Sequence, residues 1–222
     1  MDYTKTLIMA CATVIEEMLP LFPPEMSYQV FDFGLHANPD KLRCTLQAAI
    51  NAVGDEIHAI ILGYGLCSQA VIGIKAANCT LIVPRVDDCI AVFLGSRSAY
   101  KTQYSTEPGT YYLTKGWIEA SNSPFTEYER LAQRYGQEKA EFITKVMLGN
   151  YKRLALINTG QYRLDHYREY AKEVAKRFGL SYQEIEGSNA MLRKMILGPW
   201  DDDFVIVQPG ETIQFSHFFQ SE

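Results

Sequence analysis

Three cysteines of this 222-residue chain occupy one kind of position, and they are its clearest chemical feature. Cys11 ends an early apolar run, Cys67 follows a glycine-containing turn, and Cys89 follows a pair of aspartates. Each position is the end of an expected strand beside the start of an expected helix. Because the positive end of a helix dipole lowers the pKa of a thiol, we expect thiolates, the nucleophilic and metal-binding form of cysteine.

A shared site for the three cysteines implies a cation. Three thiolates that face one point repel one another unless a metal ion or a cluster lies among them. Three sulfur ligands with an open fourth position suit zinc, or an iron–sulfur cluster with one exposed iron. The alternative is that each cysteine is a small buried apolar residue, as we expect for Cys44 and Cys79.

Charged residues precede the third of these cysteines. Asp88 is expected to orient a ligand or to move a proton, and Asp87 is a further oxygen donor. Arg85 is expected to hold an anionic group of a substrate with its guanidinium fork. Pairing of Arg85 with one of the two aspartates is the alternative.

A glycine pair lies in the turn before the second cysteine. Gly63 and Gly65 do not extend to the dinucleotide-binding fingerprint, because Ser68 stands where a third glycine belongs. The two glycines indicate either a tight turn or a close approach of the backbone to a cofactor. Ser68 is a plausible helix N-cap, and all three residues are expected to contribute to cofactor binding.

A second turn of this kind lies in the later half of the chain. Asn158, Thr159 and Gly160 follow an expected strand directly. Such a turn can hold an anion on exposed backbone N–H groups, although it is also an ordinary connection between a strand and a helix. We predict that these three residues take part in cofactor binding.

Short apolar runs alternate with helical periods and predict an α/β fold. The expected strands are residues 7–11, 28–33, 57–62, 80–84, 153–158, 182–186 and 204–207. The expected helices begin near a T-x-x-E capping box at Thr13 and include residues 42–53, 123–148, 167–178 and 190–197. We expect parallel sheets with helices on both faces and a ligand at the carboxyl ends of the strands.

A segment rich in tyrosine, residues 98–124, separates two stretches of this alternation. We therefore expect two Rossmann-like halves, residues 1–122 and 123–222, with a cleft between them. Arg85 and the loops after Asn158 and Glu186 are expected to line that cleft with the cysteines.

The composition narrows the class of protein. The net charge is −5, and no cluster of Lys and Arg is present to meet a phosphate backbone, so a nucleic-acid partner is not expected. The start of the chain is polar, and its first apolar run is too short for a signal peptide or a membrane span. We expect a cytoplasmic protein with a small-molecule ligand.

Several motifs together resemble one uncharacterised family. They are L-G-Y-G-L-C-S (62–68), P-R-V-D-D-C-I (84–90), L-G-S-R (94–97), P-G-T-Y-Y-L-T (108–114) and G-W-I (116–118). The family is catalogued as domain of unknown function 1638. Its members occur in methanogens and other anaerobes, some encoded beside genes for corrinoid-dependent methyltransferases. In relatives the position of Asp87 is often His, so this chain exchanges a nitrogen donor for an oxygen donor there.

The resemblance and the cysteines lead to one favoured function and two alternatives. The favoured function is a metal- or iron–sulfur-binding protein, an enzyme or an accessory factor, in corrinoid-linked methyl or one-carbon metabolism. Corrinoid or methyltransferase proteins are then the expected partners. The first alternative is a metal-free two-cysteine acid/base enzyme of racemase-like architecture acting on a small carboxylate. The second is a non-enzymatic partner, without the D-x-H-x-x-G motif of a corrinoid carrier.

Overall fold

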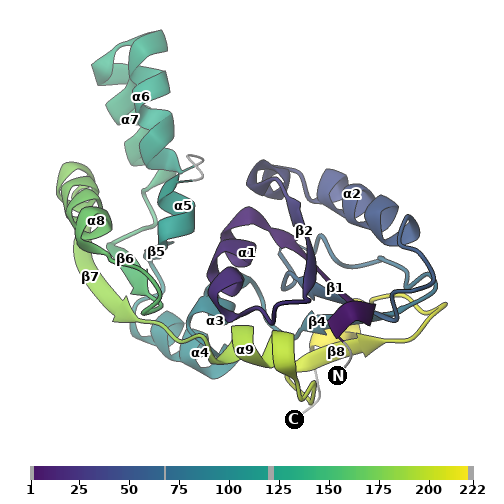
Figure 1. The fold of residues 1–222 in the computed structure, drawn as a ribbon. Coiled ribbons are helices and arrows are strands. Elements are labelled where there is room, and N and C mark those ends of the chain that lie inside the picture. Colours follow the sequence, from purple (N-terminus) through teal and green to yellow (C-terminus); the bar gives the residue numbers. More distant parts are fainter. Residues whose placement is uncertain (1–2, 68, 120–122, 220–222) are drawn as a thin grey trace. The chain divides into compact units, whose positions relative to one another are not determined.

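The computed structural model describes residues 3–67, 69–119 and 123–219, and the chain forms two compact units (Figure 1). Unit 1 contains Met1–Ser98 and Asn189–Glu222, and unit 2 contains Ala99–Ser188. The chain therefore leaves unit 1, builds unit 2 and returns. This organisation differs from the expected division at residue 122, because the C-terminal segment completes the sheet of unit 1.

Unit 1 is built on a five-stranded sheet in the order β2-β1-β3-β4-β8. Its strands are β1 (Thr6–Cys11), β2 (Ser27–Phe31), β3 (Ala59–Gly63), β4 (Thr80–Pro84) and β8 (Phe204–Val207). The first four are parallel, as predicted, so that β1, β3 and β4 end at the same edge. Strand β8, by contrast, pairs antiparallel with β4.

The helices of unit 1 follow the apolar periods of the sequence. They are α1 (Ala12–Met18), α2 (Pro39–Asn51), α3 (Cys89–Phe93) and α9 (Ala190–Leu197), with the 3-10 helices η1 (Tyr3–Lys5), η2 (Leu19–Leu21), η3 (Phe33–Ala37) and η4 (Phe215–Phe218). Helix α2 begins at the N-cap Asn38, whose side chain accepts from Lys41 N, and buries Leu42, Leu46 and Ile50. Its buried face is the one that the sequence predicted.

Two expected helix starts of unit 1 differ from the structure. The T-x-x-E capping box was wrong, because α1 begins at Ala12 and Cys11 occupies its N-cap position. Between β3 and β4, residues 64–67 and 69–79 form turns and no helix. The expected N-cap, Ser68, lies outside the described residues.

Unit 2 has a parallel three-stranded sheet in the order β5-β6-β7. Its strands are β5 (Thr110–Leu113), β6 (Arg153–Asn158) and β7 (Ser181–Glu186), and its helices are α5 (Lys115–Glu119), α6 (Pro124–Tyr135), α7 (Gln137–Met147) and α8 (Asp165–Phe178). Helix α4 (Arg97–Thr106) contains the boundary between the units. A core of Leu, Ala, Val and Phe side chains from β5, β6, α6 and α8 holds unit 2 together.

The long helix expected over residues 123–148 is two helices. Ser123 caps α6 and Pro124 takes its first position, as predicted. The first helix ends at Tyr135 because Gly136 has φ 85°, a left-handed conformation that stops a right-handed helix and that glycine adopts without strain. Helix α7 then starts at Gln137, and the two helices form a hairpin (Figure 1).

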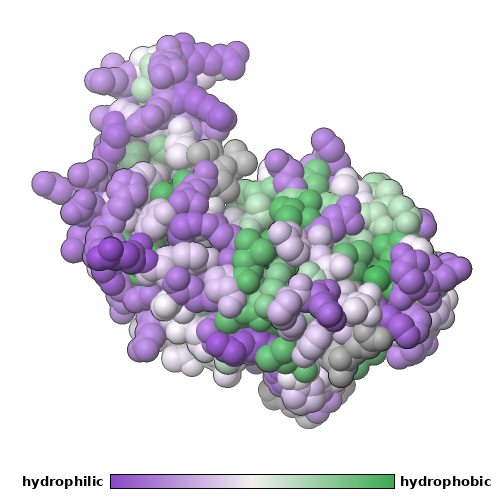
Figure 2. All heavy atoms as spheres, viewed as in Figure 1, coloured by the Kyte–Doolittle hydropathy of each residue, from purple (hydrophilic) through white to green (hydrophobic). Residues whose placement is uncertain are grey.

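The surface of the two units differs in character. On the face shown in Figure 2, hydrophilic residues dominate the helices of unit 2, whereas apolar residues reach the surface at several places on unit 1. Tyr28 and Val30 of strand β2 are among the large side chains that are exposed in unit 1. Among the described residues, no helix is both long and apolar enough to cross a membrane.

Candidate functional site

Cys11 lies at the carboxyl end of the central strands of unit 1. In the register of the sheet, Ala10 is paired with Gly63 of β3 and Cys11 with Phe31 of β2. The thiol is 1% exposed and lies 3.1 Å from the hydroxyl of Thr13. The thiol is therefore buried at the carboxyl end of β1, a central strand of the sheet.

Backbone hydrogen bonds bring the other two cysteines to the same edge. Leu66 N donates to Val86 O at 2.9 Å, and Cys67 N donates to Asp87 O at 3.0 Å. These bonds tie the turn after β3 to the turn after β4, which leads directly into Cys89 at the start of α3. Cys89 is buried and Cys67 is half-buried.

The three thiols are electrostatic neighbours, and we call Cys11, Cys67 and Cys89 the cysteine cluster. Burial raises the pKa of Cys67, and Cys11 raises it further. Burial likewise raises the pKa of Cys89 well above its usual range, followed by the influence of Cys11 and Cys67. Burial is also the main cause of the raised pKa of Cys11. The structure thus brings together the three cysteines that the sequence singled out.

The expected thiolate state was wrong for the metal-free cluster. Raised pKa values mean that all three thiols are protonated at neutral pH. Burial is the largest cause of the raised pKa of each thiol, and it outweighs the stabilisation of thiolates that we expected from the helix termini. A bound cation would reverse this balance by favouring the ionised sulfurs.

Cys67 has a backbone conformation that L-amino acids rarely adopt. Its φ is 44°, in the left-handed region that costs a non-glycine residue roughly 1–2 kcal/mol. The hydrogen bond from its N–H to Asp87 O helps to hold this conformation. Glycine would take the same conformation without strain. The cost of cysteine here therefore indicates that the thiol itself is needed at this position.

Tyr64, beside the cluster, and His36, beside Tyr64, were not predicted from the sequence. Tyr64, between the two glycines, is 1% exposed, and its pKa is raised by burial and then by Cys11, Cys67 and Cys89. The ring of His36 lies 5.8 Å from the Tyr64 ring, centroid to centroid. Both residues follow strands at the same edge as the cysteines, which is the signal that could have identified them.

Asp88 combines a structural role with a place beside the thiols. Its carboxylate caps α3 by accepting from Ile90 N at 2.9 Å. Burial raises its pKa, and Asp87 adds to the increase. Its charge in turn contributes to the raised pKa of Cys67 and Cys89. A proton-transfer role for Asp88 stays a prediction, and Asp87 itself lies 3.8 Å from the Arg97 guanidinium.

Arg85 binds backbone carbonyls of its own chain. Its guanidinium donates to the carbonyl of His217 and, at 3.0 Å, to that of Phe204. Its backbone N–H donates to Asp203 O at 2.7 Å. These contacts join the end of β4 to the C-terminal segment. The structure therefore gives Arg85 a role in holding unit 1 together, and a clamp on a substrate anion stays a prediction.

Replacement of Arg85 by Met is expected to lower the free energy of unfolding by about 2–4 kcal/mol. The loss follows because two backbone carbonyls lose a charged hydrogen-bond donor in a partly buried place. Urea denaturation measures it. Arg43→Met is the matched control, since Arg43 forms an ion pair with the exposed Asp40 on the surface of α2 and its replacement should change stability by less than about 0.5 kcal/mol. Equal stability of the two variants would contradict the structural role.

Close packing accounts for both glycines before Cys67. A Cβ on Gly63 would lie 2.5 Å from the Cβ of Ala10, and a Cβ on Gly65 would lie 2.5 Å from Val86 O. The space beside each glycine is thus filled by the protein itself. A direct role of Gly63 and Gly65 in cofactor binding stays a prediction, as it does for Ser68, which lies outside the described residues.

Replacement of Gly65 by Ala is expected to destabilise unit 1 by about 2–4 kcal/mol. The new Cβ would push against the backbone at Val86, where the turns after β3 and β4 are joined, and backbone cannot move away cheaply. Thermal unfolding measures the effect. Gly54→Ala is the control, because its Cβ would meet only the flexible carboxylate end of Glu56. A Gly65→Ala protein as stable as the control would contradict this packing.

The turn after β6 lies in unit 2 and is internally bonded. The Asn158 side chain accepts from Gly160 N at 2.9 Å and donates to Glu184 at 3.1 Å. Glu184 in turn pairs with Arg168 at 2.6 Å. Because the Gly160 N–H is already donated, it is not available to an anion, in contrast to our expectation. Thr159 also has an interaction partner in the folded chain. Position 160 has a φ of 74°, a conformation that glycine adopts without strain.

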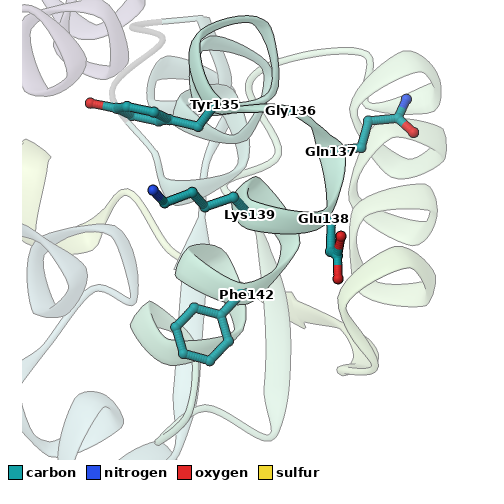
Figure 3. A pocket seen from close by; sticks show the side chains of 6 residues that line it. All are labelled: Tyr135, Gly136, Gln137, Glu138, Lys139 and Phe142. Atoms are coloured by element: carbon teal, nitrogen blue, oxygen red, sulfur yellow. The ribbon is translucent and has the colours of Figure 1, made fainter.

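Two surface pockets lie away from the cysteine cluster. In unit 2, Figure 3 shows a pocket where α6 meets α7, with Tyr135, Lys139 and Phe142 on one side and Gln137 and Glu138 pointing away from them. In unit 1, a second pocket is lined by Gln47, Asn51, Lys75, Ala76, Ala77, Asn78 and Gly210. The latter lies where the chain enters β3 and β4, whereas ligands of parallel sheets bind where strands end.

The donor set of the cluster is that of a soft metal, but its side chains are not arranged around one. Within residues 3–67, 69–119 and 123–219, no group of three or more His, Cys, Asp and Glu side chains has the arrangement of a metal site. Cys44 is exposed and Cys79 is buried, and neither contributes to the raised pKa values of the cluster.

Comparison with known proteins identifies a family without a known activity. No match was found among the curated proteins or among the solved structures. Residues 30–196 match the family described as protein of unknown function (DUF1638). The match contains Tyr64, Cys67, Asp88 and Cys89, whereas Cys11 precedes it. The match spans most of the chain, and the protein therefore belongs to the DUF1638 family.

Proposed function

We propose that this protein binds zinc or an iron–sulfur cluster through Cys11, Cys67 and Cys89. The observation that supports the proposal is their mutual electrostatic influence at one edge of the sheet, where three separate strands end. A purely apolar role for a cysteine does not require other cysteines nearby. Three adjacent sulfurs, in contrast, are the ligand set of a soft metal with one open position.

The residues around the cluster fit such a group. The buried hydroxyl of Tyr64 has no hydrogen-bond partner among the described residues, so it is available to a group bound at the cluster. Binding requires the cysteine side chains to turn toward a common point and to release their protons. The bound group would act as a Lewis acid if it is zinc, or carry electrons if it is a cluster.

The metabolic role rests on the family resemblance. A place in corrinoid-linked methyl or one-carbon metabolism, as an enzyme or as an accessory factor, follows from the genes that accompany some relatives. Corrinoid or methyltransferase proteins are the proposed partners, a small molecule is the proposed ligand, and the cytoplasm is the proposed location. Asp88 is the residue proposed to orient that ligand or to move a proton, because it lies beside the cluster.

The metal-free alternative has less support. A two-cysteine acid/base enzyme needs one thiolate and one thiol at neutral pH, and burial raises the pKa of all three thiols here. The two Rossmann-like halves with a cleft between them, which the sequence predicts for the chain whatever its function, stay a prediction. The same holds for Asn158, Thr159 and Gly160 as residues that bind a cofactor.

Metal analysis of protein purified without oxygen tests the proposal. We expect either iron with an equal amount of sulfide and visible absorption, or zinc without colour, in stoichiometric amounts. Reconstitution with zinc, or with iron and sulfide, should load protein that loses its metal during purification. Protein that contains no metal and takes up none on reconstitution would contradict the proposal and leave the acid/base alternative.

A further inference from the structure

The Tyr64 hydroxyl is a buried polar group that the fold of unit 1 does not use. The residue is 1% exposed, and the oxygen has no hydrogen-bond partner in the part of the chain that the structure describes. A buried hydroxyl without a partner costs about 1–3 kcal/mol relative to one that is bonded. Phenylalanine would fill the same space without that cost, so the hydroxyl calls for a functional explanation.

The position of Tyr64 places this hydroxyl beside the cysteine cluster. Tyr64 directly follows Gly63, the residue of β3 that pairs with Ala10 just before Cys11. Cys11, Cys67 and Cys89 each influence the hydroxyl electrostatically, so all three sulfurs lie near it. These cysteines are not among the causes that raise the pKa values of Tyr111, Tyr167, Tyr170 and Tyr182.

A neighbouring aromatic ring packs against the tyrosine ring. The His36 ring lies 5.8 Å from it and is itself 5.1 Å from the Phe33 ring, centroid to centroid. His36 is held in turn by a hydrogen bond between its Nδ1 and Phe33 O at 2.9 Å. Since the tyrosine is also buried, its hydroxyl is held away from water before any ligand binds.

We infer that Tyr64 is a positioning residue of the cysteine cluster, whose hydroxyl donates a hydrogen bond to a metal-bound cysteine sulfur. This inference rests on the proposed metal binding. Three ionised sulfurs beside the Asp88 carboxylate place excess negative charge in a buried site, and a donor aimed at sulfur stabilises that charge. Hydrogen bonds of this kind to metal ligands set affinity and reduction potential in metalloproteins.

Tyr64→Phe distinguishes this role from a packing role because its two effects have opposite signs. In metal-free protein the variant should be as stable as the wild type or more stable, since an unpaired hydroxyl is removed. Its affinity for metal should be about 10–100-fold weaker, since a ligand loses its donor. Co²⁺ serves as the probe: its competition with a chelator gives the affinity, and its sulfur-to-metal charge-transfer bands should shift in the variant.

The control and the outcomes separate this inference from the proposed function. Tyr28→Phe, at an exposed tyrosine of β2, should change neither the Co²⁺ affinity nor the spectrum. Wild-type protein that binds neither Co²⁺ nor Zn²⁺ and takes up no cluster would overturn the proposed function and this inference together. Wild-type protein that binds Co²⁺, with a Tyr64→Phe variant of equal affinity and unshifted bands, would overturn the Tyr64 role alone.

Discussion

Substitution of any one residue of the cysteine cluster by Ser is expected to remove most of the bound metal. A serine hydroxyl is not ionised at neutral pH and is a poor ligand for a soft metal, so a three-sulfur site loses an essential donor. We expect Cys11→Ser, Cys67→Ser and Cys89→Ser each to weaken metal binding by at least about 100-fold. Residues that only support a metal ligand typically contribute about 10–100-fold to the affinity, and loss of a ligand itself should cost at least as much. Metal content after anaerobic purification and competition with a chelator measure this.

Two other cysteines of unit 1 provide matched controls. Cys44 is exposed on α2, and Cys79 is buried before β4, and both should keep full metal content as Ser variants. The pattern of three sensitive and two insensitive positions is the decisive result. Loss of metal in only two of the three cluster variants would show that one cysteine is not a ligand. Equal metal content in all five variants would mean that the metal is bound elsewhere.

The metal-free protein is expected to lose stability steeply above about pH 9. A free thiol of the unfolded chain titrates near 9.0, whereas burial raises the pKa of Cys11, Cys67 and Cys89 above that value in the folded state. As the pH rises above 9.0, the unfolded chain releases these protons first, so unfolding is favoured. Each thiol that stays protonated in the folded state while it ionises in the unfolded chain lowers the free energy of unfolding by about 1.4 kcal/mol per pH unit. Below about pH 9 the thiol is protonated in both states, so the free energy of unfolding does not change with pH on its account.

Urea denaturation of metal-free protein between pH 7 and 10.5 measures this dependence. Cys67→Ser should reduce the slope above pH 9, whatever its effect on the stability at neutral pH, because one titrating group is removed. Cys44→Ser is the control, since that thiol is exposed in the folded chain. Above pH 10, Tyr64 should add to the loss, because its pKa is also raised. A flat dependence up to pH 10 would show that the thiols are not buried together.

Local sequence patterns determined most of the elements and the residues at their ends. Residues 80–84, 153–158, 204–207 and 190–197 form β4, β6, β8 and α9 as the apolar runs predicted. A run of apolar residues between turn residues can be assigned from local sequence alone, because its side chains must be buried in any compact fold. The same reasoning placed Cys11, Cys67 and Cys89 at strand ends, and parallel strands bring such ends to one edge.

Other features depend on segments that are distant in sequence. Strand β8 lies antiparallel beside β4, and Arg85 contacts the C-terminal segment. Local sequence pattern could assign neither the direction of β8 nor the role of Arg85, because both depend on residues more than 100 positions away. Strand β5 was missed because its tyrosines, Tyr111 and Tyr112, are only partly buried and give no clear alternation. Gly136 divided an expected helix, since an isolated glycine can either continue or end a helical period.

The sequence by itself determined that three thiols meet at one edge of an α/β sheet, because strand direction and residue order are enough for that. Only the tertiary structure decided their chemical state. Helix termini visible in the sequence favour thiolates, but burial in the folded chain raises the pKa of each thiol. The pKa depends on how much water and how many like charges surround a group, and these are properties of the packed chain. The same packing left the hydroxyl of Tyr64 without a partner beside them.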